Sequence, residues 1–598
     1  MPTVIIDGKE LTVDKGTNLI EACRALGLEI PHFCYHPGLP VVGQCRMCQV
    51  EVEGQPKLAI ACATEAADKM VVRVHSERAV KARKAVLEFL LLNHPLDCPI
   101  CDRGGECPLQ EYTMAHGPGK SRFAEQAIDK VHRTKARPIG PYVIFDAERC
   151  VLCTRCVRFC KEVPGTAELG VIQRGDRSEI GLFPGKQLDN PLSGNVIDLC
   201  PVGALTSRDY RFKSRPWDLV ARVDTTCALC STGCSITMDV RYLKARREVL
   251  RVRPRVNKAV NTYWICDQGR FGFHFIHDEA RLRAPSVRED GHRRSLSWDE
   301  ALGRTARGLA EALRAGAGTV GVIASSRLTN EEAYLVQRFA RDVLRTPNLD
   351  FRLRPEQEPE GDRKLDVLRH ADQTPNTRGL RAIGLLPGAG GLGVAEMLAA
   401  ARDGRLKALL VIEEDPLGDP RWAGPGQEAF ARLDHIAVAD LFLTRTGEAG
   451  HVVFPARSYA EKEGSFTNAE GRVQRVRPAV EPPGQIWSLA EILGGLARHL
   501  GTPFPVLGPR EAFEALVREV PAFAGMGYEA LDPVGLPLSG NGKGSAGSGW
   551  LAPTQAPRPS QGGCPGESRA ETRGPSVLPN VLAGKLSPRE PCATMRPS

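Results

Sequence analysis

The sequence has little that would place the chain in a membrane or a secretory pathway. Its first residues lack the basic segment followed by an apolar run that marks a signal peptide. No apolar run approaches the ~20 residues of a membrane-spanning helix. The longest, Val86–Leu92, is interrupted by Glu88. We therefore expect a soluble chain without a signal peptide, which reaches a membrane only through partner chains.

Charge of one sign is also scarce. The net charge is +8, from 79 basic and 71 acidic residues, which is small for 598 residues. It does not favour nucleic acid or a membrane surface as a partner, and we interpret the basic run Arg241–Arg255 as a solvated face. The apolar fraction of 42% is that of an ordinary globular protein, and the length allows three or more domains.

Cysteine is absent between Cys266 and Cys564, yet 17 of the 19 cysteines lie before residue 267. In a chain without a signal peptide we expect reduced thiols, because disulfides are rare in the cytosol. Metal binding is therefore the better interpretation of this cysteine content. Of the cysteines before residue 267, 15 fall with His94 into four groups of distinct spacing.

The first group, C-x10-C-x2-C-x13-C, follows a ferredoxin-like start. A hairpin is predicted around Asp7-Gly8, between apolar runs at 4–6 and 11–13, then a helix capped by Thr17 with Cys23 in the core. Plant-type [2Fe–2S] ferredoxins have the shorter spacing C-x4-C-x2-C…C. Soft thiolates suit iron in two oxidation states, and a four-cysteine zinc site is the alternative. The candidate [2Fe–2S] ligands are Cys34, Cys45, Cys48 and Cys62.

The second group, H-x3-C-x2-C-x5-C, follows a predicted helix at 78–92 with Val86, Leu87 and Leu90 on its apolar face. A lone histidine is usually structural, but this one leads a group that lacks a fourth thiolate. Imidazole in place of thiolate removes a negative charge and should raise the cluster potential. A zinc site with the same donors is the alternative. The candidate [4Fe–4S] ligands are His94, Cys98, Cys101 and Cys107.

The third group offers five cysteines for one cluster. The run C-x2-C-x2-C-x3-C has bacterial ferredoxin spacing, in which the fourth cysteine precedes proline and serves the other cluster of a pair. Here Lys161 follows Cys160, whereas Pro201 follows Cys200. Five thiolates cannot hold two four-thiolate clusters, so we interpret Cys160 as a buried bystander. The candidate [4Fe–4S] ligands are Cys150, Cys153, Cys156 and Cys200.

The fourth group, C-x2-C-x3-C-x31-C, has enough thiolates for a further [4Fe–4S] cluster. A zinc ribbon tolerates similar gaps and is the alternative. The candidate ligands are Cys227, Cys230, Cys234 and Cys266.

Residues 276–530 alternate helical and strand-like segments, which predicts an α/β domain. A helix is expected at 299–313 after the N-cap Ser297, and buried strands at 319–324 and 408–412. The sequence GAGGLG at 388–393 matches a dinucleotide fingerprint, but a proline directly before it favours an ordinary glycine-rich turn. Beyond residue 530 the chain is rich in Gly, Pro and Ser, which predicts disorder.

The four groups, in this order, resemble the large iron–sulfur subunit of bacterial respiratory complex I, the NADH–quinone oxidoreductase. The resemblance covers the first 275 residues. Trp264–Arg270 fits the form of the family that carries the fourth cluster. The motifs are QCRMC at 44–48, NHPLDC at 93–98, the cysteine run at 150–156, DLCPVGA at 198–204 and TCALC at 226–230.

Residues 276–530 resemble that subunit's molybdopterin-oxidoreductase-like domain, through SWDEA at 297–301 and the segment 461–472. In the family this domain has lost its molybdenum, and no cysteine is present here to bind it. The domain is short for the family, with a gap near 353–377. The resemblance implies a multidomain α+β and α/β chain. Its parts are a β-grasp [2Fe–2S] domain (1–77), a His/Cys3 segment (78–139), a ferredoxin-like [4Fe–4S] domain (140–219), a [4Fe–4S] subdomain (220–275), the domain without molybdenum (276–530) and a disordered tail (531–598).

The resemblance implies an electron-transfer subunit with one [2Fe–2S] and three [4Fe–4S] clusters, on the cytoplasmic side of the plasma membrane. Electrons would enter from an NADH- and FMN-binding flavoprotein and leave to a ferredoxin-like two-cluster subunit toward quinone, with a small [2Fe–2S] subunit as a further partner. This chain itself would bind neither NADH nor quinone. One alternative is a molybdopterin-dependent formate dehydrogenase-type catalytic subunit. Another is a zinc-dependent scaffold, which would be colourless.

Overall fold

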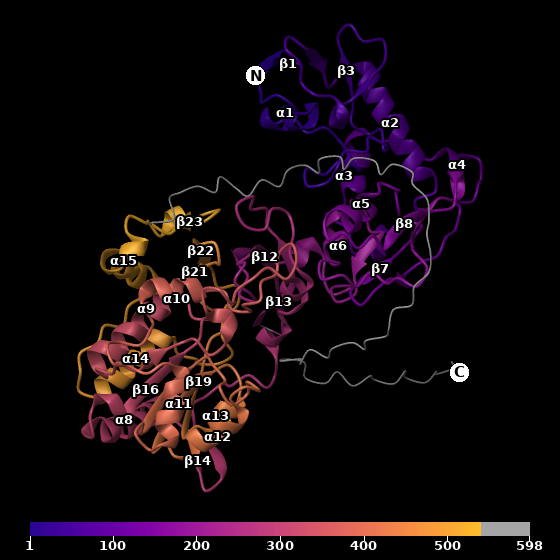
Figure 1. Ribbon diagram of the computed structural model, residues 1–598. Coiled ribbons are helices and arrows are strands. Elements are labelled where there is room, and N and C mark those ends of the chain that lie inside the picture. Colours follow the sequence, from indigo (N-terminus) through magenta and orange to yellow (C-terminus); the bar gives the residue numbers. More distant parts are fainter. Residues whose placement is uncertain (245, 540–598) are drawn as a thin grey trace, which may run out of the picture. The chain divides into compact units, whose positions relative to one another are not determined.

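The computed structural model describes residues 1–244 and 246–539 of the chain (Figure 1). Residues 1–77 form a five-stranded sheet of order β2-β1-β5-β3-β4, in which β1 and β5 are parallel and the other pairs antiparallel. One core of buried side chains lies between this sheet and its helix. The elements are β1 (Thr3–Ile6), β2 (Lys9–Thr12), α1 (Leu19–Ala25), β3 (Gln49–Val52), β4 (Ala59–Ile60), η1 (Ala61–Ala63) and β5 (Val71–Arg73).

The predicted hairpin is confirmed, because Asp7 and Gly8 have φ of 44° and 81°, as a two-residue turn of type I′ requires. The predicted N-cap is wrong by one residue. Asn18, rather than Thr17, accepts the hydrogen bond from the Glu21 N–H, at 3.0 Å. Backbone hydrogen bonds hold Thr17 in the preceding turn, so the helix starts one residue later. Cys23 is fully buried, as predicted, and burial raises the pKa of its thiol to about 12.

The predicted helix at 78–92 is α2 (Glu77–Leu92), with Ser76 as its N-cap. Leu87 is fully buried, while Val86 and Leu90 are partly buried against the same core. No helix in the described part of the chain combines the length and the apolar character needed to cross a bilayer. The elements that follow are η2 (Cys98–Ile100), α3 (Pro108–His116) and α4 (Arg122–Glu125).

Residues 137–207 form a three-stranded sheet of order β10-β7-β6 and a separate hairpin of β8 and β9. Side chains of this region share one core with residues of the loop around Cys34 and of helix α2. The ligand loops of the first three groups therefore pack on common apolar contacts. The elements are β6 (Arg137–Pro138), β7 (Val143–Phe145), α5 (Arg155–Glu162), β8 (Leu169–Ile172), η3 (Gly175–Arg177), β9 (Glu179–Leu182), α6 (Asn195–Leu199), β10 (Leu205–Ser207) and η4 (Pro216–Asp218).

Residues 221–277 form an antiparallel sheet of order β11-β12-β13. The basic run at 241–255 lies on this sheet, and its interpretation as a solvated face is wrong in part. Arg251 is ion-paired with the fully buried Asp239 and, at 2.8 Å, with Glu106. Distant carboxylates, which sequence periodicity does not show, therefore take up part of this charge. The elements are β11 (Ala221–Thr226), β12 (Ser235–Leu243), β13 (Arg246–Pro254), α7 (Asp267–Phe271) and η5 (His274–His277).

The remaining described residues are built on a seven-stranded sheet of order β15-β14-β20-β19-β18-β16-β17, in which the last five strands are parallel. The α/β prediction for this region is therefore confirmed. Helix α8 begins after the predicted N-cap Ser297, and the two predicted strands are β16 and β18. The sheet strands are β14 (Ser286–Glu289), β15 (His292–Ser295), β16 (Val320–Ala324), β17 (Leu349–Asp350), β18 (Ala408–Ile412), β19 (His435–Asp440) and β20 (Val452–Pro455).

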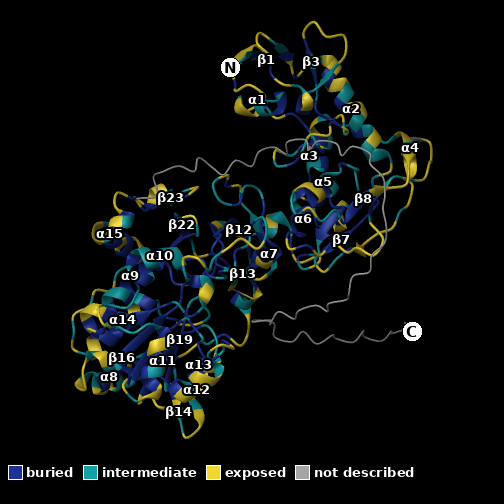
Figure 2. Cartoon of the chain, viewed as in Figure 1, coloured by how far each residue is buried: buried dark blue, intermediate teal, exposed yellow. Residues whose placement is uncertain are grey.

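Helices cover both faces of this sheet. Alternate residues of β18 point to opposite cores: Leu410 packs with α8, α9 and α14, and Val411 with α11 and α12. Figure 2 shows the central strands in the buried colour. The helices are α8 (Trp298–Arg314), η6 (Ala317–Thr319), α9 (Asn330–Arg338), η7 (Phe339–Val343), η8 (Pro355–Gln357), α10 (Thr377–Ile383), α11 (Val394–Arg402), α12 (Ala423–Ala431), α13 (Arg445–Ala449), α14 (Leu489–His499), α15 (Pro509–Glu519) and η9 (Pro521–Phe523).

The glycine-rich segment 388–393 joins α10 to α11. A dinucleotide fingerprint follows a strand, whereas this segment follows a helix, and the Gly388 N–H donates to the Pro347 carbonyl at 2.9 Å. The interpretation as an ordinary turn is therefore confirmed.

Order extends past the predicted boundary at residue 530. A second small sheet of β21 (Gly464–Thr467), β22 (Arg472–Val476) and β23 (Leu536–Pro537) follows η10 (Glu529–Leu531). Leu531 and Leu538 are buried in the core of the α/β domain, so the predicted tail is wrong for residues 531–539. Composition misled here, because a few leucines among Gly and Pro are enough to anchor a short strand. The rest of the predicted tail, 540–598, lies outside the described residues.

Candidate metal centres

The first group lies in the loop between α1 and β3 and in the short turn η1. Cys34, Cys48 and Cys62 are buried, and Cys45 is half-buried. Hydrogen bonds from the thiols of Cys45 and Cys62 lower the pKa of Cys34 to about 2. The Cys34 N–H also approaches the Cys45 sulfur at 3.5 Å. The fold thus brings all four predicted sulfurs together as one interacting set.

The second group is the most exposed. Cys101 and Cys107 are buried and Cys98 is exposed. Burial raises the pKa of both buried thiols, and the charges of neighbouring cysteines of the group add to it. The three cysteines therefore interact with each other.

His94 lies beside this group, on a cavity of about 200 Å3 that also borders Cys150. Burial, followed by the charge of Lys130, lowers the pKa of His94 to about 4. The ring is therefore a neutral imidazole, the form that ligates metal. Its described neighbours are Lys130, Arg149 and Asp97 rather than the three cysteines, so ligation by His94 stays a prediction.

The third group lines one apolar cavity. All four predicted cysteines border it, together with Phe145, Ile180 and Val202. Burial raises the pKa of the Cys153 thiol to about 11, with a further contribution from Cys200. Cys160 is fully buried elsewhere, against Glu168, as a bystander would be.

The fourth group is buried at the end of β11 and the start of α7. Cys266 caps α7, and its sulfur accepts a hydrogen bond from the Gly269 N–H at 3.3 Å. Burial, followed by the charge of Cys230, raises the pKa of Cys266 to about 12. The 31 intervening residues are folded back by β12 and β13, so the distant fourth cysteine joins the other three.

No three or more His, Cys, Asp or Glu side chains within residues 1–244 and 246–539 are close enough to share one ion. A cluster distributes its ligands over two or four irons, so its thiolates lie farther apart than ligands of a single ion. The donor sets fit such clusters: three are buried groups of four thiols, and each thiol interacts with another of its set.

The structure adds residues that sequence reasoning missed. A Cβ built on Gly203 would lie 2.0 Å from the Cys101 sulfur. Only glycine therefore lets the loop after Cys200 approach the second group. Arg103, Arg155 and Arg158 donate to backbone carbonyls of neighbouring ligand loops. Neither feature has a local signal, although a glycine directly after a ligand motif is a hint of close approach.

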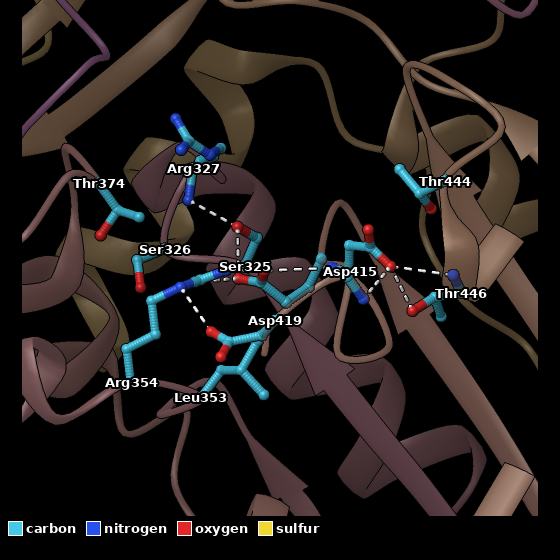
Figure 3. Close-up of polar contacts among 12 residues, drawn as sticks. Ser325, Ser326, Arg327, Leu353, Arg354, Thr374, Asp415, Asp419, Thr444 and Thr446 are labelled. Atoms are coloured by element: carbon cyan, nitrogen blue, oxygen red, sulfur yellow. Dashed lines mark hydrogen bonds and ion pairs between the residues drawn. The ribbon is translucent and has the colours of Figure 1, made fainter. Parts of the chain in front are cut away.

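In open α/β sheets, ligands bind at the carboxyl ends of parallel strands. Here that edge is occupied by the chain's own polar contacts (Figure 3). Glu414 accepts hydrogen bonds from the Ser325 hydroxyl at 3.3 Å and from Arg354 at 3.0 Å. Arg354 also lies 3.3 Å from Asp419, and Asp415 accepts from the N–H and hydroxyl of Thr446 at 2.9 and 2.6 Å.

A second set of charges lies beside this edge. The ammonium of Lys462 donates to Glu413 and, at 3.1 Å, to Glu332. Burial alone would lower the pKa of Lys462, but these carboxylates raise it. Burial raises the pKa of Asp440 to about 8. The edge therefore carries excess carboxylates whose nearby cations are already paired, an environment that does not fit the pyrophosphate of a pterin dinucleotide.

Five protein families match successive parts of the chain. Together they define a protein class: several iron–sulfur cluster modules followed by a molybdopterin oxidoreductase-type domain. The matches are the 2Fe-2S iron-sulfur cluster binding domain (2–77), the NADH-ubiquinone oxidoreductase-G iron-sulfur binding region (83–122), the NADH-quinone oxidoreductase subunit 3 ferredoxin-like domain (140–206), the molybdopterin oxidoreductase Fe4S4 domain (220–278) and molybdopterin oxidoreductase (367–499).

Curated relatives agree. The NADH-quinone oxidoreductase G subunit of Streptomyces coelicolor is 46% identical over 363 residues, which cover 60% of this chain and 42% of that protein. The G subunit 2 of the same enzyme in Rhizobium meliloti is 45% identical over 352 residues, 58% of this chain and 40% of its own. The 78 kDa subunit of NADH-ubiquinone oxidoreductase of Neurospora crassa is 46% identical over 297 residues, 50% and 39%.

The chain is thus a homologue of the G subunit of NADH-quinone oxidoreductase. The alignments span about two fifths of the length of these curated relatives.

Proposed function

We propose that the chain is an electron-transfer iron–sulfur subunit of the peripheral arm of NADH–quinone oxidoreductase. The observation that carries this proposal is the assembly of three buried four-cysteine groups, and a three-cysteine group beside His94, in a homologue of the G subunit. When bound, the clusters supply one-electron redox chemistry. The chain's own residues hold them, exclude water from most sulfurs and set the local charge.

The ligands in this proposal are the predicted ones, and the family matches support one [2Fe–2S] and three [4Fe–4S] clusters. Each module keeps the fold of its family: β-grasp for 1–77, a His/Cys3 segment for 78–139, a ferredoxin-like domain for 140–219 and the fourth cluster's subdomain for 220–275. The sets are Cys34, Cys45, Cys48 and Cys62; His94, Cys98, Cys101 and Cys107; Cys150, Cys153, Cys156 and Cys200; and Cys227, Cys230, Cys234 and Cys266.

The partners in this proposal are an NADH- and FMN-binding flavoprotein, a small [2Fe–2S] subunit and a ferredoxin-like two-cluster subunit. Through them the chain is held at the cytoplasmic face of the plasma membrane. The names of the relatives, which are subunits of one oxidoreductase, support an assembly of this kind.

A molybdopterin-dependent catalytic subunit of the formate dehydrogenase type is the second candidate, because residues 367–499 match molybdopterin oxidoreductase. Two observations count against it. No cysteine lies between Cys266 and Cys564, and the carboxyl edge of the sheet is filled by ion pairs such as Arg354–Glu414. We therefore propose that the domain carries no molybdenum, and molybdenum in purified protein would revive this candidate.

Iron and acid-labile sulfide per chain, with EPR of the reduced state, test the proposal on anaerobically purified protein. Four clusters require about 14 iron atoms, as 2 + 4 + 4 + 4, and one [2Fe–2S] signal among [4Fe–4S] signals. About 10 would leave the fourth group empty. Zinc in place of iron would end the electron-transfer proposal.

A further inference from the structure

Arg158 joins the ligand loops of the first and third groups. It lies on α5, two residues after Cys156. Its Nη2 donates to the Cys34 carbonyl at 2.5 Å and to the Cys153 carbonyl at 3.3 Å. Its Nη1 donates to the Pro40 carbonyl at 2.5 Å. One guanidinium thus holds the first ligand of one group against the second ligand of the other.

Arg155, one turn earlier on α5, repeats this bridge. It donates to the Leu199 carbonyl at 3.2 Å, directly before Cys200, and to the Tyr35 carbonyl, directly after Cys34. Residues three apart share a helix face, so both guanidinium groups occupy the same contact between the two loops.

These two cations have no carboxylate to balance them. In the described residues all their hydrogen-bond acceptors are backbone carbonyls. The opposite charges in range are thiolates of both groups, Cys34 and Cys153 for Arg158, and Cys153 and Cys200 for Arg155. An unbalanced, partly buried cation is costly, and an anionic cluster on either side removes that cost.

The contact between the second and third groups is different. Arg149, directly before Cys150, pairs with Asp97 at 2.9 Å, directly before Cys98. Arg103, which donates to the Cys200 carbonyl, lies 3.8 Å from Glu106. Carboxylates therefore neutralise the bridging arginines here, and bare positive charge is confined to the contact between the first and third groups.

We propose that Arg155 and Arg158 are positioning residues that act as a shared counter-charge of the first and third clusters, raising both reduction potentials and holding the two ligand loops together. This inference rests on the proposed function, since it requires clusters in both groups. Cluster potentials depend on net charge and hydrogen bonds. Loss of one charge about 10 Å away at an effective dielectric constant of ~20 changes the reduction equilibrium about tenfold, or ~59 mV for one electron.

The test is an EPR-monitored redox titration of the full-length, cluster-loaded chain. Arg158→Gln removes the charge, Arg158→Lys keeps it without the planar fork, and Arg103→Gln is the matched control at the neutralised contact. We expect Arg158→Gln to lower the potentials of the [2Fe–2S] cluster and the third cluster about tenfold in equilibrium constant. Arg158→Lys should largely restore both. Arg103→Gln should leave the [2Fe–2S] potential unchanged.

Unchanged potentials in Arg158→Gln, with all cluster signals present, would overturn the inference. If the glutamine variant loses a cluster but the lysine variant keeps it at the wild-type potential, the charge is required and the inference stands. If both lose it, Arg158 is only a brace and the inference fails. Absence of cluster signals from the wild-type chain would instead refute the proposed function, so the two failures are distinguishable.

Discussion

The cluster-bearing part of the chain and the α/β domain treat buried cations in opposite ways. Around the first and third groups, Arg155 and Arg158 face backbone carbonyls and thiols. In the α/β domain, Lys462 and Arg354 are paired with carboxylates of the chain itself. The first region is electrically complete only with an anionic group present. The second is complete on its own, as expected for a domain without a cofactor.

The largest effect should come from removing a cluster thiolate. Cys153→Ser should lose the third cluster and lower iron from about 14 to about 10 per chain. Cys160→Ser is the matched control, since Cys160 is fully buried against Glu168, away from the cavity of the third group. Iron and sulfide analysis checks both. Equal iron loss in the two variants would place Cys160 among the ligands.

Breaking the self-sufficient region should instead cost stability. Lys462→Met leaves Glu332 and Glu413 without their buried cation and should destabilise the α/β domain by about 3–5 kcal/mol. Denaturant unfolding measures this, and the iron content should not change. Arg314→Met is the control, because its pair with Glu311 is exposed and contributes little. Equal destabilisation by both variants would contradict the assigned role of Lys462.

A smaller effect is expected from pH. Burial raises the pKa of Asp440 from the ordinary 3.8 to about 8, so the folded chain keeps a proton that the unfolded chain has lost. Stability should therefore fall as pH rises from about 4 to 8, by up to about 1.4 kcal/mol per unit. Asp440→Asn imitates the protonated carboxyl and should reduce this slope. Urea unfolding at pH 5 and pH 8 gives it, and an unaltered slope would exclude the buried proton.

The smallest shift should come from His94→Cys. A fourth thiolate adds negative charge to the second cluster, so the protein should assemble with that potential lowered. A redox titration of its EPR signal checks this. An unchanged potential would remove His94 from the ligand set and assign the cavity beside it another role.

Much of the metal chemistry was visible in the sequence because most ligands of each group are close along the chain. The pattern C-x2-C is read without knowing the fold, and the same holds for the Asp7-Gly8 turn and the N-cap Ser297. Errors arose where local signals compete. Thr17 and Asn18 are both good caps, and only the preceding turn decides between them. The short strand at Leu536 has the composition of a disordered tail.

By itself, then, the sequence determined which cysteines form groups, that the later domain is α/β, and which family the chain resembles. These follow from spacing and periodicity. Only the tertiary structure decided what surrounds the groups. Arg158 and Cys34 are 124 residues apart, and Gly203 meets Cys101 across about a hundred. No local pattern encodes such contacts, because they exist only once separate modules pack together, and these contacts set the charge around each cluster.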